Sequence, residues 1–96
     1  MLVLRVLRHE PLHGYAIALR IHQISSDALR VEEGSLYPAL QKLLLKGWVT
    51  ARWITSDSKR KVREYRITAG GLKQLDAEIN SYRRVSKAIQ AVLETA

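Results

Sequence analysis

The last third of the chain carries an apolar stripe that constrains the fold more than any other feature of the sequence. Between Leu72 and Leu93, apolar and small residues recur at alternating intervals of three and four. This heptad period is typical of a helix that packs along a second helix. The chain of 96 residues has no other segment long enough to cover the stripe, so we expect a second copy to cover it. The predicted dimer interface consists of Leu72, Leu75, Ile79, Tyr82, Ile89 and Leu93.

A stripe that packs only on its own domain is the alternative. That interpretation explains Leu72 and Leu75, which lie at the start of the predicted helix, better than it explains Ile89 and Leu93. We therefore favour a homodimer.

Positive charge is concentrated in one segment. The stretch from Lys42 to Arg66 contains eight basic and two acidic residues, so it holds +6 of the formal net charge of +7. A nearly neutral body with one basic segment is typical of a protein that binds a polyanion. Nucleic acid is favoured over an anionic membrane, because the segment alternates like a pair of strands and lacks the moment of a surface-lying helix.

Hydrophobic spacing predicts four helices and one hairpin. A short first helix ends before Pro11, and Gly47 is placed to end the third helix in a left-handed conformation. Thr68 is a good N-cap for the last helix. The second helix is expected from about residue 13 or 14 to 23, a turn at residues 25–27, the third helix over 33–46, and the strands over 48–55 and 62–68. The apolar faces of the first three helices are expected to consist of Leu2, Val3, Val6 and Leu7; of Tyr15, Ile17, Ala18, Ile21 and Ile24; and of Leu36, Leu40, Leu43 and Leu44.

This order of elements indicates a mainly α-helical fold with a small β-hairpin. It is the order of a winged helix-turn-helix, in which the third helix enters the major groove of DNA and the hairpin contacts the backbone or the minor groove. We expect residues 1–68 to form this DNA-binding domain and residues 69–96 to form a dimerisation helix.

The third predicted helix has a small, polar and basic face opposite its leucines. Such a face lets the helix backbone approach a duplex closely, while Gln41 and Lys42 reach base edges or phosphates. Tyr37 lies on the flank, where we favour DNA over the core. The expected contacts from this helix are Gly34, Ser35, Tyr37, Pro38, Gln41 and Lys42, and those from the hairpin, mainly to phosphates, are Lys59, Arg60, Lys61 and Arg63.

Two groups of apolar residues are harder to place. Tyr15, Trp48 and Trp53 are expected in the core or on a face between domains. Leu45 lies on the face of the third helix opposite the core, and its role is open.

The sequence gives little support for catalysis or for a cofactor. It contains no cysteine, phosphate-binding glycine loop or nucleophile elbow, and its three histidines show no metal-ligand spacing. His13 is expected to cap the second helix. The longest apolar run, Tyr15 to Leu19, is too short for a membrane span or a signal peptide, so a cytoplasmic protein without enzymatic activity, cofactor or metal is expected.

The chain resembles the PadR-type transcriptional regulators, in their small subfamily with a single C-terminal helix. The resemblance covers nearly the whole sequence, and its motifs are specific only together. They are Pro11-Leu12-His13-Gly14-Tyr15, Glu33-Gly34-Ser35-Leu36-Tyr37-Pro38-Ala39-Leu40, Gly47-Trp48, and Tyr65-Arg66-Ile67-Thr68 with Gly71. The resemblance implies a dimeric, effector-responsive repressor whose third helix reads an operator.

The resemblance also implies a ligand site. Tyr82 matches a position where this family often places an aromatic residue near the dimer centre, so it either packs in the seam or stacks on a small planar effector. Two departures concern DNA binding: Glu32 replaces the usual hydroxyl N-cap, and Glu64 places an acid beside the hairpin.

Two other functions stay open at this point. One is a winged-helix module that binds protein, and the other is a small-ligand sensor that acts through the dimer crevice.

Overall fold

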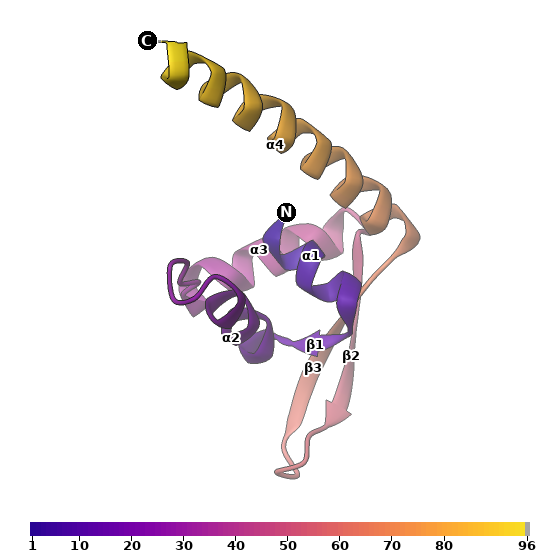
Figure 1. Ribbon diagram of the computed structural model, residues 1–96. Coiled ribbons are helices and arrows are strands. Elements are labelled where there is room, and N and C mark those ends of the chain that lie inside the picture. Colours follow the sequence, from indigo (N-terminus) through magenta and orange to yellow (C-terminus); the bar gives the residue numbers. More distant parts are fainter. Residues whose placement is uncertain (96) are drawn as a thin grey trace.

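A computed structural model describes residues 1–95, which form four helices and a three-stranded antiparallel sheet (Figure 1). The elements are, in order, α1 (Leu2–His9), β1 (Leu12–His13), α2 (Gly14–Ile24), α3 (Glu33–Leu45), β2 (Val49–Thr55), β3 (Lys61–Ile67) and α4 (Ala69–Thr95). In Figure 1 the β2–β3 hairpin leaves the group of α1, α2 and α3 on one side, and α4 leaves it on the other. The predicted fold class, a winged helix-turn-helix with a long C-terminal helix, is confirmed.

One hydrophobic core joins the three short helices, the sheet and the start of α4. Its best buried members are each at most 4% exposed: Leu4, Leu7, Ile17, Ile21, Leu36, Leu40, Val49, Tyr65 and Leu75. The apolar face predicted for α3 points into this core, and so do Val3, Val6 and Leu7 of α1, but Leu2 at the start of α1 is 42% exposed. On α2, Ile17 and Ile21 do so as expected, but Tyr15 and Ile24, at the two ends of the helix, are 62% and 68% exposed. The packing of α1 and α3 does not extend far enough to cover these two ends.

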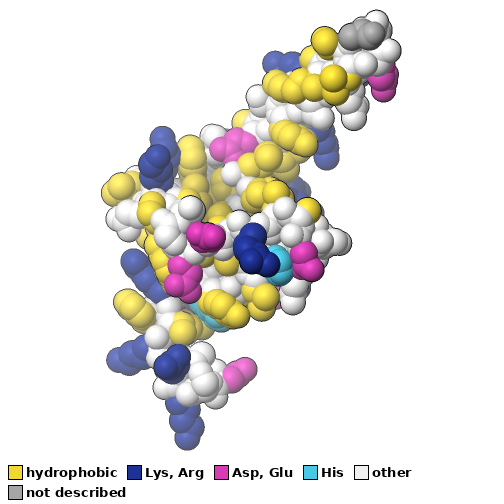
Figure 2. All heavy atoms as spheres, turned by 90° about the vertical axis from the view of Figure 1, so that its left-hand side faces the viewer, with side chains coloured by type: hydrophobic (Ala, Val, Ile, Leu, Met, Phe, Trp, Pro, Cys, Tyr) yellow, Lys and Arg dark blue, Asp and Glu magenta, His cyan; other side chains and the backbone are white. Residues whose placement is uncertain are grey.

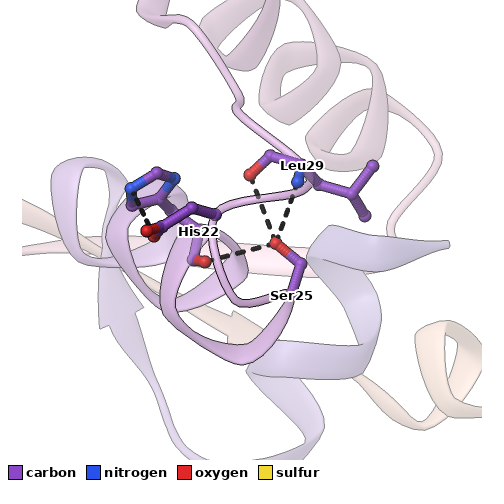
Figure 3. A network of polar contacts seen from close by, with 4 residues as sticks. His22, Ser25 and Leu29 are labelled. Carbon is purple, nitrogen blue, oxygen red and sulfur yellow. Dashed lines mark hydrogen bonds and ion pairs between the residues drawn. The ribbon is translucent and has the colours of Figure 1, made fainter.

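Side-chain hydrogen bonds hold the turn between α2 and α3 (Figure 3). The Ser25 Oγ accepts a hydrogen bond from the Leu29 amide at 3.0 Å and lies 3.2 Å from the His22 carbonyl oxygen. The His22 Nε2 lies 2.9 Å from an Asp27 carboxylate oxygen. Ser26 and Asp27 have φ angles of 52° and 69°, a left-handed conformation that short polar residues tolerate. The predicted turn at residues 25–27 is therefore confirmed, and it fixes the direction in which the chain enters α3.

The end of α3 is set by a glycine. Gly47 has φ +73°, and its amide donates to the Leu44 carbonyl at 3.1 Å, while the Trp48 amide donates to the Leu43 carbonyl at 3.0 Å. This pair of bonds is the Schellman arrangement, which satisfies the last carbonyl groups of a helix. The predicted left-handed stop is confirmed, and it turns the chain directly into β2.

The start of α4 is bonded to the same corner. The Thr68 hydroxyl donates to the Gly47 carbonyl at 2.7 Å and accepts from the Gly71 amide at 3.0 Å, so it is the predicted N-cap. The Thr68 amide donates to the Trp48 carbonyl at 3.0 Å. Gly71 is buried with its Cα against the Trp48 backbone. One corner therefore joins the end of α3, the start of β2 and the start of α4.

The sheet has one more strand than the sequence predicts. In β1, Leu12 and His13 pair with Tyr65 and Glu64 of β3, which places β3 between β1 and β2. A strand of two residues is too short to produce a recognisable alternation, and this is why it was not predicted. It ties the start of α2 to the central strand of the sheet.

The first turns of α4 pack on the domain, which corrects one predicted contact. Leu75 is fully buried by its own chain, so no part of it is left for a partner, and Ile79 packs against the same core. Glu78 accepts a hydrogen bond from Gln74 and lies 3.1 Å from the Met1 ammonium. Partial burial raises the pKa of the Glu78 carboxyl, but these two donors lower it by more, so its pKa lies below the usual value.

The two glycines at the start of α4 allow a matched test of the corner. A Cβ at Gly71 would overlap the Trp48 carbonyl oxygen and lie 2.7 Å from the Ile67 Cγ1, whereas a Cβ at Gly70 would meet nothing closer than 3.7 Å. We predict that Gly71→Ala lowers the free energy of unfolding by about 3 kcal/mol, because a rigid backbone must move. Gly70→Ala should leave it unchanged or raise it. Chemical denaturation of both variants measures this, and equal stabilities would contradict the proposed close packing.

Candidate nucleic-acid interface

The outward face of α3 is exposed along its length. Gly34, Ser35, Pro38, Gln41 and Lys42 all lie on it, as the sequence predicts. Leu45 continues this face and is 78% exposed, but nothing in the structure explains its presence there. Glu32 makes no side-chain capping bond, so the start of α3 lacks the cap that a hydroxyl would provide.

Gly34 has no structural reason to be a glycine. Its φ is not in the left-handed range, and a Cβ built there would find no atom within 4 Å. Glycine in the middle of a helix costs about 0.5–1 kcal/mol relative to alanine, and Gly34, in the first turn of α3, carries up to that cost. A cost without a benefit to the fold suggests that this position serves the approach of a partner to the helix backbone.

Tyr37 lies on the flank of α3 against the start of α2. It is 49% exposed, and a Cβ at Gly14 would lie 3.2 Å from the Tyr37 Cε1 and 3.3 Å from its hydroxyl oxygen. Gly14 thus provides the flat surface on which the tyrosine ring lies. The ring is therefore half buried, which lies between the core position and the DNA-facing position that were considered from the sequence.

His13 is positioned by its own helix. Its Nδ1 accepts a hydrogen bond from the Ala16 amide at 3.3 Å, which confirms the predicted capping role. Within residues 1–95, no group of three or more His, Asp or Glu side chains is arranged to hold a metal ion.

The β2–β3 hairpin forms the wing, defined here as residues 49–67. Alternate residues of the two strands share a face: Val49 and Tyr65 are buried at the base, while Trp53 and Arg63, directly opposite each other, lie further toward the tip. The face that covers the core thus continues outward beyond the helices. Trp53 is consequently 68% exposed, which corrects the expectation of a core position.

The tip of the wing is basic and held in a tight turn. The Ser56 amide donates to the Arg60 carbonyl at 2.7 Å, and Lys59 has a left-handed φ of 62°. Lys59, Arg60, Lys61 and Arg63 are all exposed, and none of them takes part in an ion pair with the residues 1–95. Figure 2 shows lysine and arginine side chains at the lower end of the molecule, where the wing projects.

Glu64, an acid within the wing, forms an ion pair on the face of the sheet opposite Trp53. The Arg52 Nε donates to a Glu64 carboxylate oxygen at 3.1 Å, and these two residues are cross-strand partners. They occupy the face opposite Trp53 and Arg63. The Glu64 side chain therefore points away from Arg63 and from the cations on the same side of the sheet as Arg63.

Beyond Ile79, the predicted stripe of α4 has no cover from its own chain. Tyr82, Ile89 and Leu93 are 58%, 54% and 73% exposed, and Leu72 near the start of the helix is 39% exposed. Val85 and Val92, which the predicted seam did not include, are exposed beside them. Hydrophobic side chains follow this part of the helix in the upper half of Figure 2.

Within residues 1–95, no helix combines the length and the apolar character needed to cross a bilayer. The helix-turn-helix, the basic wing and the polar outer face of α3 define the chain as a winged helix-turn-helix protein.

Known proteins place it more narrowly. Residues 3–77 match the model of the transcriptional regulator PadR-like family. A PadR family transcriptional regulator from Eggerthella lenta is 28% identical, with a TM-score of 0.79 over 99% of this chain and 83% of that one. A PadR-like transcriptional regulator from Bacillus cereus is 26% identical, with a TM-score of 0.80 over 95% of this chain and 86% of that one.

A third relative is much longer. An uncharacterized 37.1 kDa protein from a Streptomyces fradiae transposon is 40% identical over 86 residues, which are 90% of this chain but only 23% of that protein. The chain belongs to the PadR-like family of transcriptional regulators, as its sequence motifs suggested.

Gly34 provides a test in which stability and binding should change in opposite directions. We predict that Gly34→Ala raises the free energy of unfolding by about 0.5–1 kcal/mol, through helix propensity. It should weaken binding to the operator by about 1 kcal/mol or more, because the added methyl group holds the helix away from the duplex. Thermal unfolding and fluorescence anisotropy measure the two effects. Gly70→Ala is the control, and unchanged operator affinity in Gly34→Ala would remove Gly34 from the interface.

Proposed function

We propose that two copies of this chain bind an operator and repress transcription. The α3 helix of each copy enters a major groove through Gly34, Ser35, Gln41 and Lys42, and the wing holds the adjacent backbone. The observation that carries this proposal is that Tyr37 of α3 and the wing cations Arg60, Lys61 and Arg63 line the same open cleft. The reading helix and the charged hairpin therefore present one continuous surface to a duplex.

A winged-helix module that binds protein is the less supported alternative. The wing carries five exposed cations without ion-pair partners within residues 1–95: Lys59, Arg60, Lys61, Arg63 and Arg66. Unpaired charges of one sign favour a partner with dense opposite charge, and a DNA duplex has a phosphate for every 1.7 Å of its axis. Catalysis is not part of the proposal.

Salt dependence tests the role of the wing. If a dimer neutralises ~6–8 phosphates, log K against log salt should have a slope of about −5 to −7. Replacing Lys59, Arg60 and Lys61 by alanine should flatten this slope and weaken binding to all DNA sequences alike, since phosphate contacts carry no base information.

The control for that experiment removes the same charge elsewhere. Arg83, Arg84 and Lys87 are exposed on α4, beyond the winged-helix core. Their replacement by alanine should leave the slope nearly unchanged. Equal slopes in the two triple variants would show that the wing has no special part in DNA binding.

The uncovered stripe of α4 supports the dimer. Five large apolar side chains on one side of the helix are each more than half exposed: Tyr82, Val85, Ile89, Val92 and Leu93. A stripe of this length is unusual on a monomer, and in heptad spacing it suits antiparallel or parallel pairing with an identical helix. A dimer also gives two reading helices, which a two-fold symmetric operator requires.

Ile89 and Ala91 form a matched pair for testing the dimer. Both are exposed, but at about 100° per residue Ala91 points to the side opposite Ile89. Ile89→Asp should give monomers, because dimerisation would bury an unpaired charge at a cost of several kcal/mol. Ala91→Asp adds the same charge and should remain dimeric. Light scattering after size exclusion measures the mass, and a dimeric Ile89→Asp protein would contradict the assignment of the stripe.

The last part of the proposal concerns an effector site at Tyr82. Tyr82 lies in the stripe and is 58% exposed, so in a dimer it would be enclosed near the second helix. We propose that a planar apolar effector stacks on this ring in the crevice and changes the distance between the two reading helices. Light scattering should show that Tyr82→Ala stays dimeric. Fluorescence titration should show that this variant no longer binds the planar aromatic compounds that release the operator from the wild-type protein. Equal ligand affinity in wild type and Tyr82→Ala would assign Tyr82 to packing alone.

A further inference from the structure

Four of the six aromatic residues of the chain line a single cleft. The cleft has a volume of about 660 Å³ and lies between the start of α2, the flank of α3 and the wing. Its aromatic residues are Tyr15, Tyr37, Trp53 and Tyr65. Only Tyr65 is buried in the core, so core packing alone does not account for the position of the other three rings.

The aromatic surface in this cleft is open to solvent. Trp53 is 68% exposed and Tyr15 is 62% exposed. Leaving rings of this size in water forgoes the free energy that their burial would provide. The arrangement therefore suggests a partner that covers them in the functional complex.

The charges that line the cleft have one sign. Arg60, Lys61 and Arg63 contribute cations, and no carboxylate within residues 1–95 is part of the lining. Of the two acids of the wing, Glu64 is bonded to Arg52 on the opposite face of the sheet, and Asp57 at the tip is not part of the lining. The partner of the cleft must therefore combine negative charge with apolar surface.

Arg63 lies over two aromatic rings of the cleft. Its guanidinium carbon lies 6.0 Å from the ring centroids of both Trp53 and Tyr65. Stacking on aromatic faces leaves the edge of a guanidinium free to bond a phosphate. An ordered cation loses less entropy on binding than a freely moving one.

A small ligand fits this cleft poorly. Sites for small molecules bury most of the ligand surface, roughly 70–90%. Trp53 and Tyr15 are more than half exposed, and the cleft is open to solvent. A long polymer that passes through the cleft suits it better than a molecule enclosed by it.

We propose that the cleft holds one sugar–phosphate strand of duplex DNA, at the point where the strand separates the groove of α3 from the groove of the wing. The proposal rests on the proposed function and adds Trp53 and Tyr15 to the DNA-binding residues. Their rings pack on deoxyribose carbons, while Lys61 and Arg63 neutralise the flanking phosphates. The Tyr37 hydroxyl donates a hydrogen bond to a phosphate oxygen.

Two substitutions that each remove one positive charge from the wing test this assignment. Arg63 and Arg52 are both exposed on the wing, but only Arg63 faces the cleft. Arg63→Gln should weaken binding to a random 30-base-pair duplex roughly tenfold and reduce the salt slope by about one per protomer. Arg52→Gln should weaken it less than about threefold, although it also leaves Glu64 unpaired. Equal effects would mean that the wing acts only through its total charge, and would overturn the proposal.

Tryptophan fluorescence gives a readout that does not depend on charge. The chain has two tryptophans, and Trp48 does not line the cleft. Duplex DNA should protect wild-type fluorescence from quenching by acrylamide, and in Trp53→Phe this protection should disappear while the duplex still binds. Trp53→Ala, which lacks a ring, should bind roughly tenfold more weakly with an unchanged salt slope.

The outcomes separate this proposal from the proposed function. If wild-type protein binds no duplex by anisotropy, both fail. If it binds duplex but DNA leaves the quenching of Trp53 unchanged, only the cleft assignment fails. Protection of Trp53 by small aromatic anions but not by DNA would make the cleft a ligand site and overturn the proposal.

Discussion

The contact between Gly71 and the backbone of Trp48 holds together the parts of the molecule on which function depends. The α3 helix, which we propose faces DNA, ends at Leu45 just before Gly47, the wing begins at Val49, and α4, which we propose forms the dimer, begins at Ala69. The Thr68 hydroxyl bridges Gly47 and Gly71, and no side chain separates the two backbones. A change in the direction of α4 therefore changes the position of α3 and the wing together. Such a rigid corner is what an effector in the dimer crevice would need in order to move a reading helix.

The wing has two faces with different tasks. One face covers the core at its base with Val49 and Tyr65, then continues past the helices with Trp53, Arg63 and Lys61. The other face carries the Arg52–Glu64 ion pair, whose charges cancel. Arg63 and Lys61 therefore share the first face without an acid opposite them, while on the second face only Arg66 is left without an ion-pair partner within residues 1–95. A segment with mixed charges in sequence thus carries charge of a single sign on the face that we propose meets DNA.

Local rules predicted most of the fold. The stop at Gly47, the cap at Thr68, the turn at residues 25–27 and the buried face of α3 each depend on a few neighbouring residues, and all are present in the structure. The strand β1 was missed because two residues carry no periodicity. The exposed positions of Tyr15 and Trp53 were missed because periodicity predicts which face of a helix or strand a residue occupies. It does not predict how far along that face the packing of other elements extends. For the same reason, the heptad pattern could not separate Leu75, which its own domain buries, from Ile89, which it leaves exposed. Sequence patterns placed the exposed residues of α3 and the wing correctly, because both surfaces follow from simple periodicity, but the cleft between them depends on tertiary structure.

The central claim is that two copies of this chain place two α3 helices and two wings on one operator. Hydroxyl-radical footprinting of the purified protein on the DNA upstream of its own gene tests this most directly. The account predicts two related protected sites whose centres are separated by about one helical turn or a small multiple, roughly 10–10.5 base pairs each. Each site should include protected sugars on both sides of the reading groove, where the wing holds the backbone. Protection of a single site without a symmetric partner, or no protected site at saturating duplex binding, would contradict the account.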